Sequence, residues 1–145
     1  MGKRELHYGA ALLAAPLFCL VYHVFFTSQS LIYEELFGKK QILLWGVIIF
    51  PVIEELAFRG MIQEYIATKT NRFPLFFYLS LSNILTSVLF AAIHFFYHQA
   101  IWVLLVFFPS LVFGYFKEQY QSIVPGIILH AFYNLNFILL VGNIS

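Results

Sequence analysis

The sequence predicts an all-α fold, a polytopic membrane helix bundle of about five transmembrane helices. Two observations carry this prediction. Of the 145 residues, 61% are hydrophobic and only 10% are charged, whereas a soluble domain carries about 25% charged residues. The apolar residues also gather into stretches of roughly 20, the length of a helix that crosses a bilayer. We therefore expect a single membrane domain over residues 1–145, because the chain lacks the polar residues to cover a water-facing surface.

The expected spans are apolar stretches joined by short polar segments. They cover about 9–27, 42–67, 74–97, 100–116 and 123–142. The first is longer than the apolar part of a cleaved signal peptide and no small-residue cleavage site follows it, so we expect a retained signal anchor. Residues 28–40 are amphipathic with polar ends, which is typical of a segment at the membrane interface. Residues 97–100 predict a tight turn, and Pro125 predicts the start of the last helix.

The basic residues of the loops predict the orientation of the chain. Cytoplasmic loops of membrane proteins carry an excess of lysine and arginine. With the N-terminus in the cytoplasm, the inside residues are Lys3, Arg4, Lys69, Arg72 and Lys117, and the outside residues are Lys39 and Lys40. We therefore expect a multi-pass protein of the cell (plasma or inner) membrane with a cytoplasmic N-terminus.

Composition excludes several classes of function. A net charge of +1 offers no basic surface for nucleic acid. Cys19 is the only cysteine, so internal disulfides and cysteine-rich metal sites are excluded. All seven acidic residues are glutamates, which excludes a Ser-His-Asp triad and a two-aspartate protease.

The stretch "PVIEELAFRG" (51–60) places three charges inside a predicted span. Each charge at the centre of a membrane helix costs roughly 2.5–3.5 kcal/mol on insertion scales, and such groups commonly mark a working site. The i,i+4 spacing predicts an ion pair between Glu55 and Arg59. Glu54 projects about 100° away from Glu55 around the helix, so the two carboxylates cannot bind the same partner. Pro51 can open or kink the helix one turn earlier. A structural lock between helices is the alternative for this cluster alone.

Two further groups lie in other spans. "FAAIH" places Phe90 and His94 four residues apart on the third predicted helix. The same helix carries a stripe of small or polar residues suited to close helix contact. The stripe consists of Ser80, Asn83, Ser87, Ala91 and His94. "HAFYN" places His130 and Asn134 four residues apart on the last helix. Three helices that each bring polar groups into the bilayer favour a functional site over a structural lock.

Together the three motifs resemble a known family. "EELAFR", "FAAIH" and "HAFYN" are similar to the EExxxR, FxxxH and HxxxN signatures of the CPBP intramembrane proteases. This group includes CAAX prenyl endopeptidases, bacteriocin self-immunity (Abi) proteins and proteases that process C-terminal sorting tags. The resemblance covers a motif-bearing core of about 42–137, with the motifs in family order.

The resemblance implies an intramembrane endopeptidase that hydrolyses a peptide bond of a membrane-associated substrate. Glu54 matches the family's catalytic glutamate, and Glu55 and Arg59 match its partners. His94 matches the histidine of the second motif, while His130 and Asn134 match the third. Peptide hydrolysis fits these positions, because a carboxylate in surroundings of low dielectric constant is a competent general base. His94 would assist with the water, and the third motif would donate to the oxyanion or the leaving amine.

Cofactor use follows from the same residues. A metal-dependent version would use Glu54, His94 and His130 as three zinc ligands with water in the fourth place. No HExxH pair is present, and Asn134 stands where an acid would suit a metal site. We therefore expect no cofactor, with zinc as the alternative.

Other classes of function use the same polar residues. A proton-coupled transporter could employ them as a relay, although five helices without a repeat suit alternating access poorly. A non-catalytic immunity or binding protein is the other alternative. The expected partners are the lipid bilayer and a peptide or protein with a membrane-associated segment. A CAAX-like tail, a bacteriocin leader and a sorting tag all fit this description.

Overall fold

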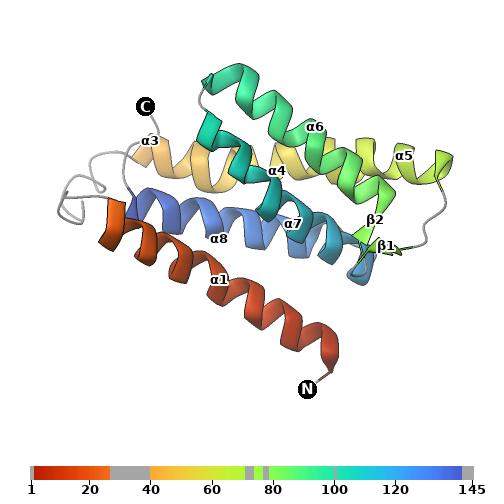
Figure 1. Ribbon diagram of the computed structural model, residues 1–145, viewed down its shortest axis with the longest axis horizontal. Helices are drawn as coiled ribbons and strands as arrows, with labels where there is room; N and C mark the ends of the chain where they lie inside the picture. The colour runs from red at the N-terminus through yellow and green to blue at the C-terminus, as the bar shows by residue number, and fades with distance from the viewer. Residues whose placement is uncertain (1, 27–39, 71–73, 77–78, 100, 142–145) are drawn as a thin grey trace. The chain divides into compact units, whose positions relative to one another are not determined.

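The computed structural model describes residues 2–26, 40–70, 74–76, 79–99 and 101–141, and it confirms the all-α fold (Figure 1). The helices are α1 (Lys3–Phe26), α3 (Lys40–Leu43), π-helix η1 (Leu44–Ile49), α4 (Phe50–Glu55), π-helix η2 (Leu56–Ile62), α5 (Gln63–Lys69), α6 (Leu81–His98), 3-10 helix η3 (Ile101–Val106), α7 (Phe107–Tyr120) and α8 (Val124–Leu140). The chain forms two compact units, one from residues 1–52 with 128–145 and one from residues 53–127.

Three helical runs within the described residues are long and apolar enough to cross a membrane. They are Lys3–Val24, Lys40–Lys69 and Leu81–His98, and Val124–Leu140 is a shorter apolar helix. These correspond to four of the predicted spans. The predicted interfacial segment 28–40 lies outside the described residues except for Lys40, which begins α3.

The run from Lys40 to Lys69 alternates between α and π geometry. The Phe50 N–H donates to the carbonyl of Trp45, and the Gln63 N–H donates to that of Phe58. Both bonds reach back five residues, which is the wider turn of a π-helix. Pro51 lies in α4 directly after the first widened segment. The helix opening expected near the proline is therefore a π segment within a continuous run.

The third predicted helix begins later than expected. Residues 74–80 contribute a short antiparallel pair, β1 (Pro74–Phe76) with β2 (Leu79–Ser80), where Pro74 faces Ser80. The side chain of Ser80 accepts from the Asn83 N–H at 3.0 Å and caps α6. A serine cap satisfies a helix N–H that would otherwise lack a partner, so the helix starts at Leu81. At its other end Gln99 adopts φ 53°, which forms the predicted turn.

The fourth predicted helix, 100–116, is two elements. The 3-10 helix η3 comes first, and α7 then extends to Tyr120, beyond the predicted end. Pro109 explains the break, because it has no N–H to donate to an earlier turn and is tolerated in the first turn of a helix. The last helix begins as expected, with Pro125 as its second residue.

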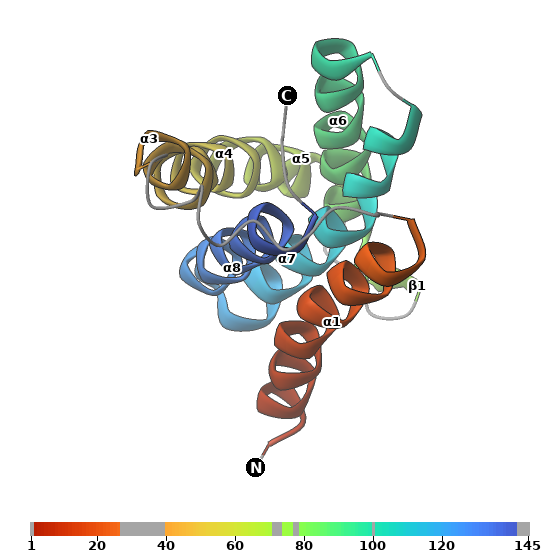
Figure 2. The ribbon, with the colours of Figure 1, turned by 90° about the vertical axis from the view of Figure 1, so that its left-hand side faces the viewer.

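In the unit of residues 53–127, α6 packs against α5, η3 and α7. Figure 2 shows η3 and the start of α7 running back beside α6. The predicted small and polar stripe is buried from Ser80 to Ala91. Asn83 donates from Nδ2 to the carbonyl of Leu111 at 2.9 Å. Gly114 of α7 lies so close that an added Cβ would overlap the Asn83 amide. The small residues thus permit the close helix contact.

The unit of residues 1–52 and 128–145 is joined by two side-chain bonds. The Tyr133 hydroxyl donates to the carbonyl of Ala11 in α1 at 2.8 Å. Asn134 donates from Nδ2 to the carbonyl of Gly46 in η1 at 2.8 Å. A Cβ on Gly46 would lie 3.3 Å from Cδ1 of Ile138, so this glycine marks a close approach of η1 to α8.

Gly114→Ala should destabilise the protein, because the new methyl overlaps Asn83 and overpacking typically costs about 1–3 kcal/mol. The measurement is the thermal midpoint in detergent. Gly60→Ala is the matched control, since a Cβ there comes no closer than 4.0 Å to another atom. Equal midpoints for the two variants would contradict the close contact.

Candidate active site

The first motif forms a buried ion pair on one helix face. Glu55 at the end of α4 and Arg59 in η2 are 0% exposed, and Oε2 of Glu55 lies 3.3 Å from Nε of Arg59. The pair predicted from the i,i+4 spacing is therefore present. A buried pair requires further hydrogen bonds, because its members have been removed from water.

Arg59 obtains those bonds from α7. Its Nη2 donates to the carbonyl of Ser110 at 3.0 Å and to the Ser110 hydroxyl at 2.7 Å. The guanidinium carbon lies 5.7 Å from the centroid of the Phe90 ring on α6. That geometry is a cation–π contact, which is strongest where water is excluded. Arg59 therefore ties its own helix to α6 and α7.

The first turn of α8 also lies against the pair. A Cβ added to Gly126 would lie 2.8 Å from Oε2 of Glu55. Only a glycine lets a backbone come this close to a side-chain oxygen without a shift. The carboxylate of Glu55 is thus held between Arg59 and the Gly126 backbone.

Glu54 has different surroundings from its neighbour. It is half-buried, whereas Glu55 is completely buried. Adjacent helical residues project about 100° apart, so the two carboxylates face different directions. The buried Glu55 pairs with Arg59, whereas part of the Glu54 side chain is exposed.

His94 is oriented by the helix that carries it. Its Nδ1 lies 3.0 Å from the carbonyl oxygen of Phe90, one turn earlier on α6. Since a carbonyl only accepts, this bond places the proton on Nδ1, and Nε2 of the neutral ring is then the nitrogen with the lone pair. The ring is half-buried. His94 can therefore accept a proton or a water hydrogen bond through Nε2.

Phe90 links the first two motifs. Its ring centroid lies 4.3 Å from that of His94 and 4.9 Å from that of Phe58, in addition to its contact with Arg59. It is 2% exposed. The phenylalanine of the FxxxH pattern therefore packs the histidine onto the Glu-Glu-Arg helix.

The third motif belongs to the other compact unit. His130 is buried on α8, and Asn134 is half-buried and bonded to Gly46 as described above. The first motif and His94 thus lie in the unit of residues 53–127, where Phe90 contacts both Arg59 and His94. His130 and Asn134 lie in the unit of residues 1–52 and 128–145.

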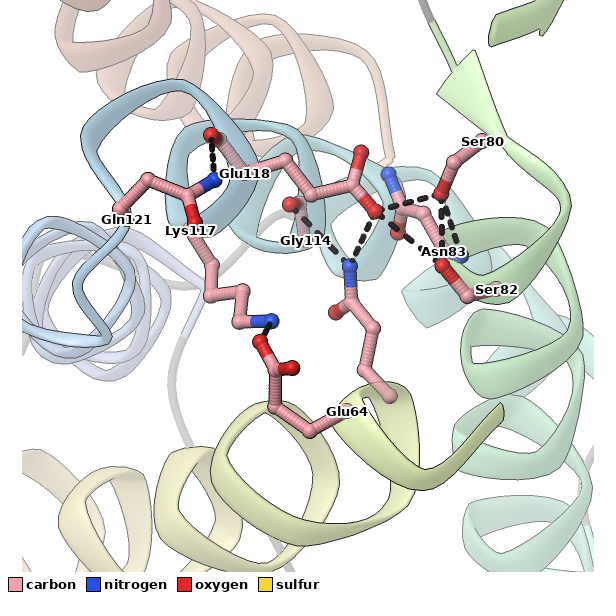
Figure 3. A network of polar contacts seen from close by, with 9 residues as sticks. Glu64, Ser80, Ser82, Asn83, Gly114, Lys117, Glu118 and Gln121 are labelled. Carbon is pink, nitrogen blue, oxygen red and sulfur yellow. Dashed lines mark hydrogen bonds and ion pairs between the residues drawn. The ribbon is translucent and has the colours of Figure 1, made fainter. Parts of the chain in front are cut away.

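A second polar cluster lies around the carboxylate of Glu118, near the end of α7 (Figure 3). Oε1 of Glu118 accepts from the hydroxyls of Ser80 and Ser82 and from Nε2 of Gln63. Beside this cluster Lys117 forms an ion pair with Glu64 of α5 (Figure 3). These contacts join α5, α7 and the start of α6. Arg59 bonds to Ser110 near the start of α7, and the Glu118 cluster lies near the end of α7.

Sequence reasoning missed several of these residues. Ser110, Gln63 and Glu118 were not singled out, although each forms a polar contact between helices. A signal was present for Gln63, because it follows Glu55 and Arg59 at the next i,i+4 position and all three are fully buried. No comparable sequence signal identifies Ser110, which lies in an otherwise ordinary apolar stretch.

A metal site in a protein needs several His, Cys, Asp or Glu side chains gathered around one point. Within the described ranges, no group of three or more His, Cys, Asp or Glu side chains is arranged to hold a metal ion.

Arg59→Ala should lower the thermal midpoint strongly. It removes the partner of a buried carboxylate and the bonds to Ser110, a change that typically costs about 3–5 kcal/mol. Ser110→Ala should cost less, because the bond to the backbone carbonyl remains. Lys69→Ala is the control, since it removes an exposed cation from the same helical run. A midpoint for Arg59→Ala equal to that of the control would mean that the pair is not required.

Comparison of the sequence with known protein families finds a match. A sequence model of the family described as type II CAAX prenyl endopeptidase Rce1-like matches residues 38–136, well over half of the chain. The matched range contains all three motifs, from Glu54 to Asn134. No curated protein and no solved structure matches the chain.

The match accounts for the charged cluster within a membrane-length helix. A bilayer helix tolerates such charges where they face other helices and serve a site. Glu55 and Arg59 are fully buried, with Arg59 in contact with α6 and α7, and the family model matches the range that carries them. The chain therefore belongs to the type II CAAX prenyl endopeptidase Rce1-like family, within the CPBP intramembrane proteases, and is a membrane-embedded peptidase.

Proposed function

We propose that this protein cleaves a membrane-associated peptide by a metal-free mechanism in which Glu54 is the general base. The observation that carries the proposal is the difference in burial between the adjacent residues Glu54 and Glu55. Glu55 is fully buried against Arg59, whereas Glu54 is half-buried on another side of the helix. A base must reach the water that it deprotonates, and Glu54 meets that requirement.

In this mechanism Glu54 takes a proton from water as the water oxygen attacks the scissile carbonyl carbon. The carbonyl oxygen becomes an oxyanion, the C–N bond then breaks, and the proton passes from Glu54 to the leaving amine. His94 assists through Nε2, which accepts a hydrogen bond from the same water. The bond from Nδ1 to the Phe90 carbonyl supports this role, because it leaves Nε2 as the acceptor.

His130 and Asn134 supply the donors for the oxyanion or the leaving amine. Donors fixed in advance at the site of developing charge provide a large part of catalysis in peptide hydrolysis. The support for these roles is the match of the third motif to the family pattern. Glu55 and Arg59 act through structure, by fixing the helix that carries Glu54.

The substrate in this proposal is a protein with a CAAX-type tail. The family description supports this class, and a prenylated cysteine brings its own attachment to the bilayer. We place the protein in the plasma (inner) membrane as a multi-pass protein, with its N-terminus in the cytoplasm. The basic residues of the loops support this orientation.

Glu54→Gln should abolish cleavage while the protein still folds, because the change keeps the size of the side chain and removes the base. The assay follows cleavage of a prenylated CAAX peptide by the reconstituted full chain, with products identified by mass spectrometry. Activity should fall below about a hundredth of wild type. Glu64→Gln is the matched control on the same helical run and should retain activity, since glutamine still accepts from Lys117. Cleavage by Glu54→Gln near the wild-type rate would remove the general-base role.

Exhaustive chelation tests the metal-free mechanism. Protein shown by elemental analysis to contain no zinc should cleave the same peptide at the untreated rate. Loss of activity that zinc restores would instead make Glu54, His94 and His130 the ligands of a catalytic metal.

A further inference from the structure

Pro51 stands at the position whose N–H would donate to the Gly46 carbonyl in the register of η1. In η1 the hydrogen bonds reach back five residues, as the bond from the Phe50 N–H to the Trp45 carbonyl shows. In the same register the Gly46 carbonyl would accept from residue 51. That residue is Pro51, which has no N–H. A carbonyl without a donor is costly inside a membrane, and a neighbouring helix commonly satisfies it.

Asn134 is the group that satisfies this carbonyl. Its Nδ2 donates to the Gly46 oxygen at 2.8 Å. The close approach at Gly46 makes the bond possible, because a Cβ at this position would press on Cδ1 of Ile138 at 3.3 Å. Gly46, Pro51, Asn134 and Ile138 all belong to the unit of residues 1–52 and 128–145.

We propose that Gly46 and Pro51 are positioning residues for Asn134. Pro51 releases the Gly46 carbonyl from the helical ladder, and the carbonyl then holds the Asn134 carboxamide in one orientation. This inference rests on the proposed function, in which Asn134 donates to the oxyanion or the leaving amine.

The donors and acceptor of the carboxamide explain why its hydrogen bond to Gly46 matters. Nδ2 carries two hydrogens, and the bond to Gly46 uses one of them. The second N–H remains to donate elsewhere. A 180° flip of the amide would bring its oxygen against the Gly46 oxygen, where two acceptors repel. The Gly46 carbonyl therefore fixes the carboxamide in one of its two flipped orientations, and with it the direction of the second N–H.

Pro51→Ala tests the inference, because alanine restores the N–H at residue 51 and gives Gly46 a backbone donor. Alanine suits a helix better than proline does, but the change also removes atoms of a fully buried ring, so the thermal midpoint should change little. The kcat for cleavage of the prenylated peptide should fall about tenfold or more, as for a misplaced oxyanion donor, with KM unchanged. Pro16→Ala, at the proline inside α1, is the matched control and should leave kcat unchanged.

A stability measurement tests the contact independently of catalysis. Asn134→Ala should lower the thermal midpoint in the wild-type background, since it leaves the Gly46 carbonyl without a donor. In the Pro51→Ala background the same change should lower the midpoint much less. Additive effects of the two substitutions would overturn the inference.

A compensating pair provides a second route to the same contact. Gly46→Ala should lower kcat by pressing α8 away, and Gly46→Ala with Ile138→Val should recover it, because valine lacks the Cδ1 atom that the methyl meets. Absence of this recovery counts against the inference.

The kinetic results separate this inference from the proposed function. Wild-type kcat for Pro51→Ala together with an inactive Asn134→Ala overturns the inference alone. Full activity of Asn134→Ala overturns both the inference and the proposed donor role.

Discussion

The buried pair of Glu55 and Arg59 is the interaction on which the described site depends. Neither side chain has any exposed surface, so each must be satisfied by protein. Glu55 lies between Arg59 and the backbone at Gly126, while Arg59 reaches Ser110 and the ring of Phe90. A hydrophobic contact could slide by a residue, whereas these directional bonds accept one arrangement. The pair therefore sets the register of the helix that carries Glu54.

Contacts of Arg59 connect this pair to the second motif. The ring of Phe90 contacts both the Arg59 guanidinium and the His94 imidazole, and the Phe90 carbonyl accepts a hydrogen bond from Nδ1 of that histidine. The FxxxH pattern is thus a unit in which one residue determines both the position and the tautomer of the other. Toward the end of the helical run, the cluster around Glu118 joins neighbouring helices with the same kinds of bond. Polar residues of this protein therefore contribute to helix packing.

Much of this arrangement could be predicted from the sequence. Composition predicted the all-α membrane bundle, and i,i+4 spacing predicted the pair of Glu55 with Arg59. The stripe on α6 predicted close packing, which Asn83 and Gly114 realise. Spacing along one helix could not identify partners on another, so Ser110 and Glu118 were missed. The break at Pro109 and the cap at Ser80 were also missed, because the apolar composition continues through both. The roles of Glu54, His94, His130 and Asn134 remain predictions from the motifs.

The π segments also affect how the long helical run fits a bilayer. A regular α-helix of the 30 residues from Lys40 to Lys69 would measure about 45 Å. A hydrocarbon core is only about 30 Å thick, and an over-long helix must tilt or deform the surrounding lipid. Wider turns place more residues in each turn, so η1 and η2 shorten the run for a given number of residues. Hydrophobic mismatch is thereby reduced in the helix that carries the charged cluster.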